Sequence, residues 1–233
     1  MASDRRVTSA LVTGASSGIG RAIAADLLAS GWDVTAVARD PARGELDGAH
    51  LVPANLLDED EAVAAVAAHR ERVGSLDLLV NASGVGFGGP VDGYPTKRFD
   101  ITFGVNIRGI FLVTREALPM LKASRGRIVN LASIAGLQAE PGLAVYGATK
   151  HAVVGLSRSL SEELFDDGVR VTALCPGFVD TPMTDFIKSQ IPAGQMVQVD
   201  DCVKAVRFLL ELSPAVKVPE LVLDGPPIPN LAE

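Results

Sequence analysis

The chain has 233 residues, of which 48% are hydrophobic and 23 are glycines, and it carries a formal net charge of −7. This length accommodates one large α/β domain with a substantial core, and the glycine-rich, aromatic-poor composition is typical of buried parallel strands. The negative charge argues against a nucleic-acid surface, and the lysines and arginines form no cluster that would overturn this interpretation.

The sequence contains no apolar stretch long enough to cross a bilayer, and the run after Arg6 is too short for the hydrophobic part of a signal peptide. Cys175 and Cys202 have neither the spacing of metal ligands nor that of a redox pair. We therefore expect a cytoplasmic protein without a membrane partner, in which both cysteines are small core residues of a reducing compartment.

Apolar runs alternate with amphipathic segments along the chain. The apolar runs predict strands at residues 10–12, 33–38, 50–52, 76–80, 127–131, 169–174 and 221–223. The amphipathic segments predict helices at residues 18–30, 58–72, 96–122, 144–165 and 199–212. This alternation predicts one domain, residues 1–233, built on a doubly wound parallel sheet with helices on both faces. The tail from Gly225 to Glu233 is rich in proline and is expected on the surface.

The first strand runs into a glycine-rich loop, and the first helix follows at once. The loop reads Thr13-Gly14-Ala15-Ser16-Ser17-Gly18-Ile19-Gly20. Glycines let the backbone turn sharply and approach a pyrophosphate, which the free N–H groups of a helix N-terminus attract. The spacing is a variant of the dinucleotide fingerprint. An ordinary glycine-rich turn is the alternative, and the flanking strand and helix make it the weaker one.

The end of the second strand bears on the choice of cofactor. An enzyme that prefers NAD usually places an acidic side chain here, on the ribose 2′-hydroxyl. In this chain Ala38 closes the strand and Arg39 follows, which suits a 2′-phosphate and favours NADP(H) over NAD(H). Asp40 complicates the interpretation, although a turn residue before Pro41 can point away, and Arg39 can also be read as a surface arginine.

Tyr146 and Lys150 are four residues apart in a predicted helix, and Ser133 lies at the end of a predicted strand. A phenol is a poor acid or base at neutral pH because its reference pKa is about 10. A cation one helical turn away favours the phenolate, so we expect Lys150 to lower the pKa of Tyr146. The pair would then serve as a proton donor and acceptor.

Three further segments complete the pattern. Asn81-Ala82-Ser83-Gly84 follows the fourth strand, Asn106 lies in Gly104-Val-Asn-Ile107, and Pro176-Gly177-Phe-Val179-Asp-Thr181 follows the sixth strand. Together with the glycine loop and the Ser133, Tyr146 and Lys150 set, these segments resemble the short-chain dehydrogenase/reductase family in its single-domain type. The resemblance runs from Thr13 to about Gly225, and it implies a Rossmann-like fold, an NAD(P)-dependent oxidoreductase and a homodimer or homotetramer paired through the helices at 96–122 and 144–165.

The resemblance also assigns roles to individual residues. It implies that Tyr146 exchanges a proton with the substrate oxygen, Lys150 lowers the Tyr146 pKa and binds the nicotinamide ribose, Ser133 donates to the substrate oxygen, and Asn106 holds a water next to Lys150. The implied cofactor contacts are Gly14, Ser16, Ser17, Gly18, Ile19, Gly20, Arg39, Asn55, Leu56, Asn81, Ala82, Ser83, Gly84, Tyr146, Lys150, Pro176, Gly177, Val179 and Thr181.

The chain departs from the family pattern in three places. The segment between Arg39 and His50 is too short for the helix often found there, Ala82 and Ser83 replace more typical residues, and the C-terminal tail is atypical. The first departure trims the adenine side, the second affects packing beside the ribose, and the third puts the usual tetramer contacts in doubt. None of them removes a catalytic group.

Three substrate loops, residues 85–90, 134–141 and 178–191, are expected to surround the nicotinamide, and they are rich in apolar side chains. Residues 181–190 are expected to form a lid over cofactor and substrate. Packing beneath the lid and direct substrate contact are equal alternatives for each apolar residue. The candidates for a pocket are Phe87, Leu137, Phe178, Met183, Phe186 and Ile187, with Gln138 as a polar exception.

Several readings of the function remain open. A neutral, fairly apolar ketone, aldehyde or alcohol is the leading substrate class, and a 3-oxoacyl thioester is the alternative within the family. A regulator that binds NADPH without turnover would have lost catalytic groups, and all four are present. A sugar-nucleotide enzyme would need different glycine spacing and a further substrate domain. The histidines, His50, His69 and His151, match no metal site and are expected at the surface or its boundary.

Overall fold

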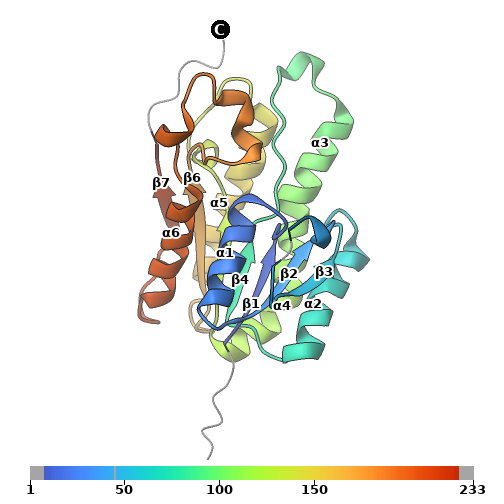
Figure 1. Ribbon diagram of the computed structural model, residues 1–233, viewed down its shortest axis with the longest axis vertical. Coiled ribbons are helices and arrows are strands. Elements are labelled where there is room, and N and C mark those ends of the chain that lie inside the picture. Colours follow the sequence, from blue (N-terminus) through green and yellow to red (C-terminus); the bar gives the residue numbers. More distant parts are fainter. Residues whose placement is uncertain (1–7, 45, 226–233) are drawn as a thin grey trace, which may run out of the picture.

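The computed structural model describes residues 8–44 and 46–225, so the proline-rich tail lies, from residue 226 on, outside the described residues. The predicted strands all form within two residues of their expected ends, and they pair in parallel into one sheet. The order across the sheet is β3-β2-β1-β4-β5-β6-β7 (Figure 1). The strands are β1 (Ser9–Thr13), β2 (Asp33–Ala38), β3 (His50–Pro53), β4 (Leu78–Asn81), β5 (Arg127–Leu131), β6 (Arg170–Pro176) and β7 (Glu220–Leu223).

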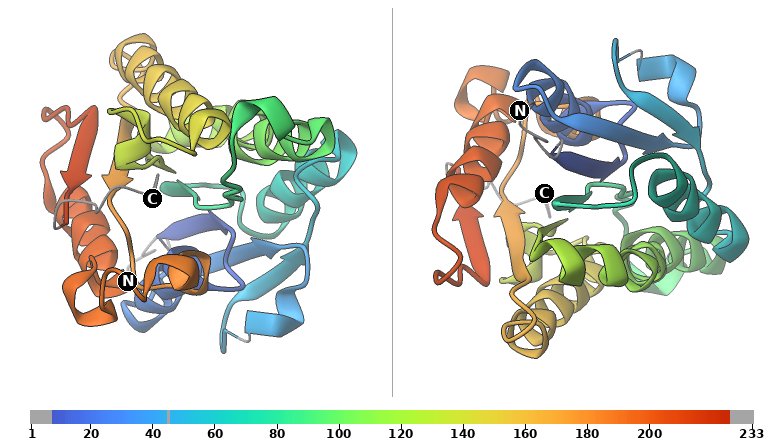
Figure 2. Two further views of the ribbon diagram at one scale, coloured as in Figure 1. Left: turned by 90° about the horizontal axis from the view of Figure 1, so that it is seen from above. Right: turned by 90° about the horizontal axis from the view of Figure 1, so that it is seen from below.

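Helices cover both faces of this sheet, which confirms the predicted Rossmann-like class (Figure 2). The helices are α1 (Gly18–Ala29), α2 (Glu59–Val73), α3 (Thr96–Phe103), α4 (Ile110–Ser124), α5 (Ala144–Glu163) and α6 (Val199–Glu211). Side chains alternate across each strand, so that Ala10 and Val12 pack with residues of α1 and α6, whereas Leu11 packs with residues of α2 and α4. Cys202 and Cys175 are fully buried, as expected of core residues.

The helix predicted over residues 96–122 is interrupted. A π-helical turn, Gly104–Gly109, separates α3 from α4. Asn106 is fully buried in this turn, and its side chain bonds to the backbone of Val85, which follows β4. The extra residue of a π-turn often marks a functional site. Here the turn carries Asn106, whose side chain holds the loop after β4.

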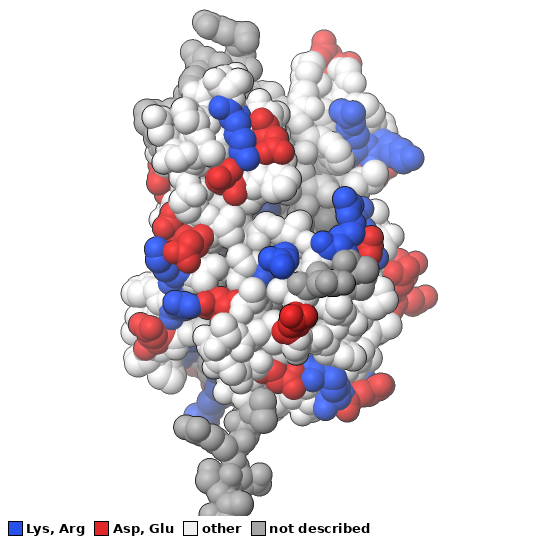
Figure 3. Space-filling model, viewed as in Figure 1, with Lys and Arg blue, Asp and Glu red and all other residues white. Residues whose placement is uncertain are grey.

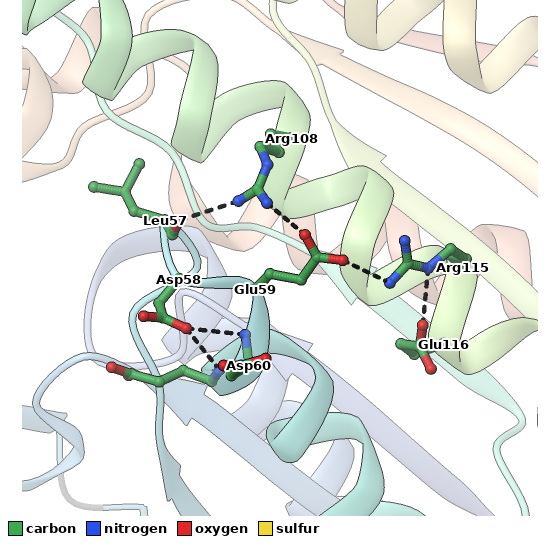
Figure 4. Close-up of polar contacts among 8 residues, drawn as sticks. Leu57, Asp58, Glu59, Asp60, Arg108, Arg115 and Glu116 are labelled. Carbon is green, nitrogen blue, oxygen red and sulfur yellow. Dashed lines mark hydrogen bonds and ion pairs between the residues drawn. The ribbon is translucent and has the colours of Figure 1, made fainter.

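Helix α2 begins as its sequence indicates. Asp58 is the N-cap residue, and its carboxylate accepts hydrogen bonds from the backbone N–H groups of Asp60 and Glu61 (Figure 4). Acidic residues fill the first turn and complement the helix dipole. The helix ends at Gly74, whose φ of 76° lies in the left-handed region.

One acidic residue of that first turn also joins α2 to α4. Glu59 pairs with Arg108 at 2.6 Å and with Arg115 at 3.1 Å, and Arg108 donates a second bond to the Leu57 carbonyl (Figure 4). These groups are about half-exposed, so the pairs contribute little to stability individually. They fix the segment that leads from β3 into α2, which lies beside the cofactor end of the site described below.

His69 does not lie at the surface. It is fully buried on α2, where Nδ1 lies 2.7 Å from the Thr35 hydroxyl and Nε2 lies 2.8 Å from the Ser75 carbonyl. A carbonyl only accepts, so Nε2 carries the proton and Nδ1 accepts from Thr35. Burial lowers the pKa of His69, which therefore stays neutral. His50 and His151 are exposed, as predicted.

The strand order places the site. The chain moves outward from β1 to β3 and then returns to β4 on the other side of β1. At such a switch point the loops after neighbouring strands separate and leave a crevice at the carboxyl edge of the sheet. The glycine loop follows β1, and the Asn81–Gly84 segment follows β4. The predicted cofactor residues therefore meet at this edge.

Candidate active site

A cavity of about 470 Å³ occupies the switch point. The space-filling view is hollowed at its upper end, between the lid region and α3, and on this face basic and acidic residues are interspersed (Figure 3). The cavity is lined by most of the residues that the sequence pointed to: Gly14, Ser16, Ser17, Gly18, Ile19, Gly20, Arg39, Asn55, Leu56, Ala82, Ser83, Gly84, Ser133, Tyr146, Lys150, Pro176, Gly177, Val179 and Thr181.

The glycine loop is held where only glycine fits. Gly14 has a φ of +68°, and a Cβ there would lie 2.7 Å from the Ala82 carbonyl oxygen. A Cβ on Gly20 would lie 2.6 Å from the Gly14 oxygen. The Thr13 hydroxyl accepts from the N–H groups of Ala82 and Ser83 at 3.1 and 3.2 Å, which ties the loop to the end of β4. The loop is therefore packed backbone against backbone.

The N-terminus of α1 opens onto the same space. The Ser17 side chain makes no capping hydrogen bond, so the first N–H groups of α1 remain available to a ligand. Positive dipole potential and free donors together suit a pyrophosphate. At Gly18, a Cβ would lie 3.5 Å from Thr181, so the start of the lid stands over the loop. A dinucleotide phosphate group fits this cradle.

Ser133 and Tyr146 meet at the other end of the cavity. Ser133 precedes a short turn, Ile134–Gly136, and its hydroxyl accepts from the Ala135 N–H at 3.2 Å. Tyr146 lies in the first turn of α5. Burial raises the pKa of Tyr146, and the hydrogen bond from Ser133 lowers it by less. Lys150 is not among the causes of this shift, so the expectation that it lowers the Tyr146 pKa is not met.

Lys150 is almost completely buried beneath Tyr146. Its ammonium group donates to the Leu131 carbonyl at 2.7 Å and lies 5.6 Å from the centre of the Tyr146 ring. Burial lowers the pKa of Lys150 to about 8. A Cβ on Gly136 would lie 2.6 Å from the Lys150 carbonyl oxygen, so the turn that carries Ser133 packs directly on α5. This contact fixes the three groups relative to one another.

Two of the predicted catalytic and cofactor residues, Asn106 and Asn81, do not line the cavity. Asn106 Oδ1 accepts from the Val85 N–H at 2.8 Å, and Nδ2 donates to the Val85 carbonyl at 2.9 Å and to the Thr149 hydroxyl at 3.1 Å. It holds the loop after β4 against α5, while its expected water stays a prediction. Asn81 is fully buried and donates to Asn130 Oδ1 at 2.8 Å, so its side chain joins β4 to β5 and does not face the cofactor space.

The adenosine end is formed by β2 and the segment after β3. Arg39 is exposed at the end of β2 and lines the cavity. Asn55 is anchored by its backbone N–H, which donates to the Glu61 carboxylate at 2.7 Å, and by Oδ1, which accepts from the Leu57 N–H at 3.3 Å. Its NH₂ group is left to bind a base. Between β2 and β3 the chain forms only a short 3₁₀ turn, Pro41–Gly44, as the length of the segment indicated.

The substrate end differs in part from the predicted pocket. Phe178, Met183 and Phe186 line the cavity, and the rings of Phe178 and Phe186 meet edge to face at 6.3 Å. Ile187, which lies within the predicted lid segment, is instead fully buried and packs with Ile191. The other predicted residues outside the lining are Phe87, Leu137 and Gln138.

The lining also contains Glu140, which lies within the predicted substrate loop at residues 134–141, and Leu143, which lies just beyond that loop and was not predicted. Both belong to the turn that precedes α5. The sequence Glu140-Pro-Gly-Leu143 carries a turn signal, Pro followed by Gly, but nothing in it states that the turn faces the substrate. Among the described residues, no cluster of His, Cys, Asp or Glu is arranged to hold a metal ion, and no helix is long and apolar enough to cross a membrane.

Comparison with known proteins agrees with this geometry. The sequence profile of the short chain dehydrogenase family matches residues 8–192. The chain is 38% identical to 2-(R)-hydroxypropyl-CoM dehydrogenase of Xanthobacter autotrophicus, over 93% of this chain and 96% of that one. It superimposes with a TM-score of 0.84 and 34% identity on the 3-ketoacyl-(acyl-carrier-protein) reductase from Brucella melitensis in complex with NADH, covering 93% and 96% of the two chains.

A third similar protein, the structure of ElxO with NADP bound, has a TM-score of 0.83 and 25% identity, covering 94% of this chain and 96% of that one. The family profile extends over most of the chain, and a relative well above 30% identity covers nearly all of it. This protein therefore belongs to the short-chain dehydrogenase/reductase family, whose members are oxidoreductases that act on alcohol and ketone groups.

Proposed function

We propose that the protein is a single-domain, NADPH-dependent reductase of neutral, fairly apolar ketones or aldehydes, which it interconverts with alcohols. The observation that carries this proposal is the one continuous cavity that joins Arg39 and the glycine loop to Ser133, Tyr146 and Lys150. Nucleotide-binding and proton-transfer groups thus share one space, and the apolar residues of the lid close its far end.

The proposed cofactor contributes the hydride, and the protein contributes binding, orientation and proton transfer. The glycine loop and the α1 N-terminus hold the pyrophosphate, while Lys150 donates to the nicotinamide ribose. Ser133 donates to the substrate carbonyl oxygen and stabilises the negative charge that develops there. Tyr146 gives its proton to that oxygen and becomes a phenolate, which the neighbouring Lys150 ammonium stabilises.

The pKa directions favour the reductive reaction at neutral pH. A general acid must carry its proton when the reaction begins. Burial raises the pKa of Tyr146, so the phenol is protonated near pH 7. Lys150, with a pKa of about 8, is still mostly charged at that pH. The pair therefore starts as a neutral phenol beside a cation, which is the state that carbonyl reduction requires.

The preference for NADPH rests on Arg39. Its guanidinium is the basic group of the cavity lining at the end of β2, where a 2′-phosphate would lie, and Ala38 leaves that position without a carboxylate. The similar structures contain NADH in one case and NADP in the other, so they do not decide between the cofactors.

A 3-oxoacyl thioester reductase is the second candidate. It is favoured by the 34% identity to the Brucella melitensis 3-ketoacyl-(acyl-carrier-protein) reductase. Against it, the described lining of the substrate end contains no fixed cation other than Lys150 to receive a phosphate or an acidic carrier. The homodimer or homotetramer expected through the helices predicted at 96–122 (α3 and α4) and 144–165 (α5) also remains a proposal, and sedimentation at micromolar concentration tests it.

The test is titration of the protein with NADPH and NADH, followed by turnover of a carbonyl panel monitored by cofactor absorbance. We expect tighter binding of NADPH and turnover that disappears in Tyr146→Phe while cofactor binding persists. Arg39→Ala should weaken NADPH binding about tenfold and leave NADH binding nearly unchanged, as loss of one phosphate contact predicts. Arg70→Ala, on the exposed surface of α2, is the matched control.

Each other outcome has a definite meaning. Tight cofactor binding without turnover of any carbonyl or alcohol would favour an NADPH-binding regulator. Turnover of 3-oxoacyl thioesters above all simple ketones would favour the second candidate. A sugar-nucleotide panel tests the remaining alternative from the sequence. Failure to bind either nucleotide would overturn the assignment of the glycine loop.

A further inference from the structure

The substrate end of the cavity contains one acidic side chain. The charged residues that line the cavity are Arg39, Glu140 and Lys150. Arg39 lies at the adenosine end and Lys150 beneath Tyr146, so Glu140 is the charge that a substrate meets beyond the reacting carbonyl. It is half-buried, and the same cavity lining contains the apolar side chains of Leu143, Met183 and Phe186.

The backbone of Glu140 is held firmly. The Leu143 N–H donates to the Glu140 carbonyl at 3.1 Å, and the intervening Gly142 has a φ of +77°, which together with Pro141 defines a type II turn. The turn is also tied to the opposite substrate loop, because the Gly89 N–H donates to the Gly142 carbonyl at 2.8 Å. Both walls of the substrate end thus fix the position of Glu140.

The same turn connects Glu140 to α5, the helix that contains Tyr146 and Lys150. The Leu143 carbonyl accepts from the Gly147 N–H at 2.7 Å, in the first turn of α5, next to Tyr146. A Cβ on Gly86, in the facing loop, would lie 3.5 Å from the Tyr146 ring and 3.8 Å from Met183. The position of the Glu140 backbone relative to Tyr146 is therefore set by hydrogen bonds of the turn.

One carboxylate oxygen has a neutral partner. The Gln138 side-chain amide donates to Glu140 Oε1 at 3.0 Å. The ion pairs of the described residues do not include Glu140, and the basic side chains of Lys188, in the lid segment, and Arg98, on α3, have other contacts. Lys188 pairs with Asp180 and Asp185, and Arg98 lies over the Phe87 ring. The negative charge of Glu140 is thus oriented but not neutralised.

We infer that Glu140 sets the charge selectivity of the enzyme. It disfavours carbonyl substrates that carry a negative charge remote from the carbonyl and favours those that carry a positive charge there. A carboxylate in partly apolar surroundings acts at short range with less screening than one in water, and like charges facing each other disfavour binding. The inference rests on the proposed function, because it assigns the substrate class of the same site.

The test uses three benzaldehydes that differ only at the para position: methyl, carboxylate and trimethylammonium. For each, kcat/KM is measured with wild type, Glu140→Gln and Glu140→Lys. We expect wild type to prefer the cation over the anion, and Glu140→Gln to reduce that ratio about tenfold, on the order of 1.4 kcal/mol. Glu140→Lys should reverse the preference. Comparing ratios between variants cancels the electronic effect of each substituent.

A matched control separates local from overall charge. Glu163→Gln removes the same charge from the exposed end of α5 and should leave the cation-to-anion ratio as it is in wild type. An equal change of the ratio in Glu163→Gln and Glu140→Gln would overturn the inference, since the cause would then be net charge. An unchanged ratio in both variants would overturn it as well.

A binding measurement distinguishes failure of the inference from failure of the proposed function. Calorimetry with the three para-substituted benzyl alcohols, on the cofactor-saturated protein, gives the same charge ratio without turnover. A Glu140-dependent ratio in binding, with no turnover of any aldehyde, would overturn the proposed reaction and leave the selectivity in place. If turnover requires Tyr146 but the cation-to-anion ratio is the same with and without Glu140, the proposed reaction stands and the charge selectivity is overturned.

Discussion

The Lys150 ammonium lies 5.6 Å from the centre of the Tyr146 ring, while its proton is donated to the Leu131 carbonyl. The cation thus stands beside the phenol without a direct hydrogen bond to it in the described structure. Burial acts on both groups, raising the pKa of Tyr146 and lowering that of Lys150 to about 8. Burial favours the neutral form of each group, but near pH 7 only Lys150 is charged, so it is the burial of Lys150 that opposes the stability of the fold.

The first prediction concerns the loss of stability that the buried Lys150 charge causes. The folded chain releases the Lys150 proton near pH 8, whereas the unfolded chain holds it up to about pH 10.5. Below pH 8 the buried cation lowers the free energy of unfolding, and this penalty disappears as the pH rises from 8 to 10.5. Lys150→Met should therefore raise the free energy of unfolding at pH 7 by about 1 to 3 kcal/mol while abolishing turnover.

Denaturant unfolding of wild type and Lys150→Met between pH 7 and about pH 10 checks this prediction. The difference between the two proteins should narrow as the pH rises. Lys204→Met is the control, because Lys204 is exposed on α6 and pairs with Asp200 at 2.7 Å. A Lys150→Met protein that is less stable than wild type at pH 7 would show that the bond to Leu131 outweighs the burial of the charge.

A second prediction compares two helical glycines. Gly20→Ala places a methyl group 2.6 Å from the Gly14 oxygen, so the glycine loop must shift. Cofactor affinity should therefore fall at least about tenfold. Gly155→Ala, in α5, meets nothing within 4 Å and should stabilise the protein by about 0.5 to 1 kcal/mol. Cofactor titration and thermal unfolding of both variants test this comparison. Unchanged cofactor affinity in Gly20→Ala would contradict the placement of the cofactor phosphates at the glycine loop.

The third prediction concerns Asn106. Asn106→Ala leaves the N–H and carbonyl groups of Val85 without their partners, which should cost about 2 to 4 kcal/mol of stability. The loop after β4 would also loosen and reduce kcat/KM. Thr149→Val removes only one acceptor of Asn106 and should cost about 1 kcal/mol. Equal losses in the two variants, measured by denaturant unfolding, would show that Val85 is held by other contacts.

The buried histidine gives a fourth prediction, on acid stability. The pKa of His69 lies below its ordinary value of 6.5, so the unfolded chain binds the proton first as the pH falls. The free energy of unfolding should therefore decrease below about pH 6.5. His69→Gln should flatten this decrease, whereas His50→Gln, at an exposed position, should not. Unfolding curves between pH 7.5 and 5 test the comparison; parallel profiles in all three proteins would rule it out.

Much of the fold could be predicted because periodicity reports burial. Local sequence within single elements was enough to predict the seven strands, the glycine loop, and the set of Ser133, Tyr146 and Lys150. His69 also had a readable signal, since it lies on the same helical face as the buried residues Ala62, Ala65 and Val66. Because histidine is polar, His69 was expected near the surface, although its helical spacing indicated the core.

Other features depend on contacts between distant segments. Helical periodicity cannot distinguish a π-turn from an α-turn over six residues, and the turn at Asn106 is bonded to Val85, from another part of the chain. The direction of the Tyr146 pKa depends on burial, which is a property of the packed site. Glu140 faces the cavity because its turn is fastened to Gly89, and no local pattern encodes that link.

The bond between Thr13 and Ala82 spans 69 positions of the chain. The glycine loop is therefore synthesised well before the segment after β4 that supports it. Pairing of such distant strands slows folding, because a long loop must close before the contact forms. Until then the nascent chain cannot bind the nucleotide. The cofactor thus acts as a ligand that stabilises the finished sheet, and it cannot guide the earliest steps of folding.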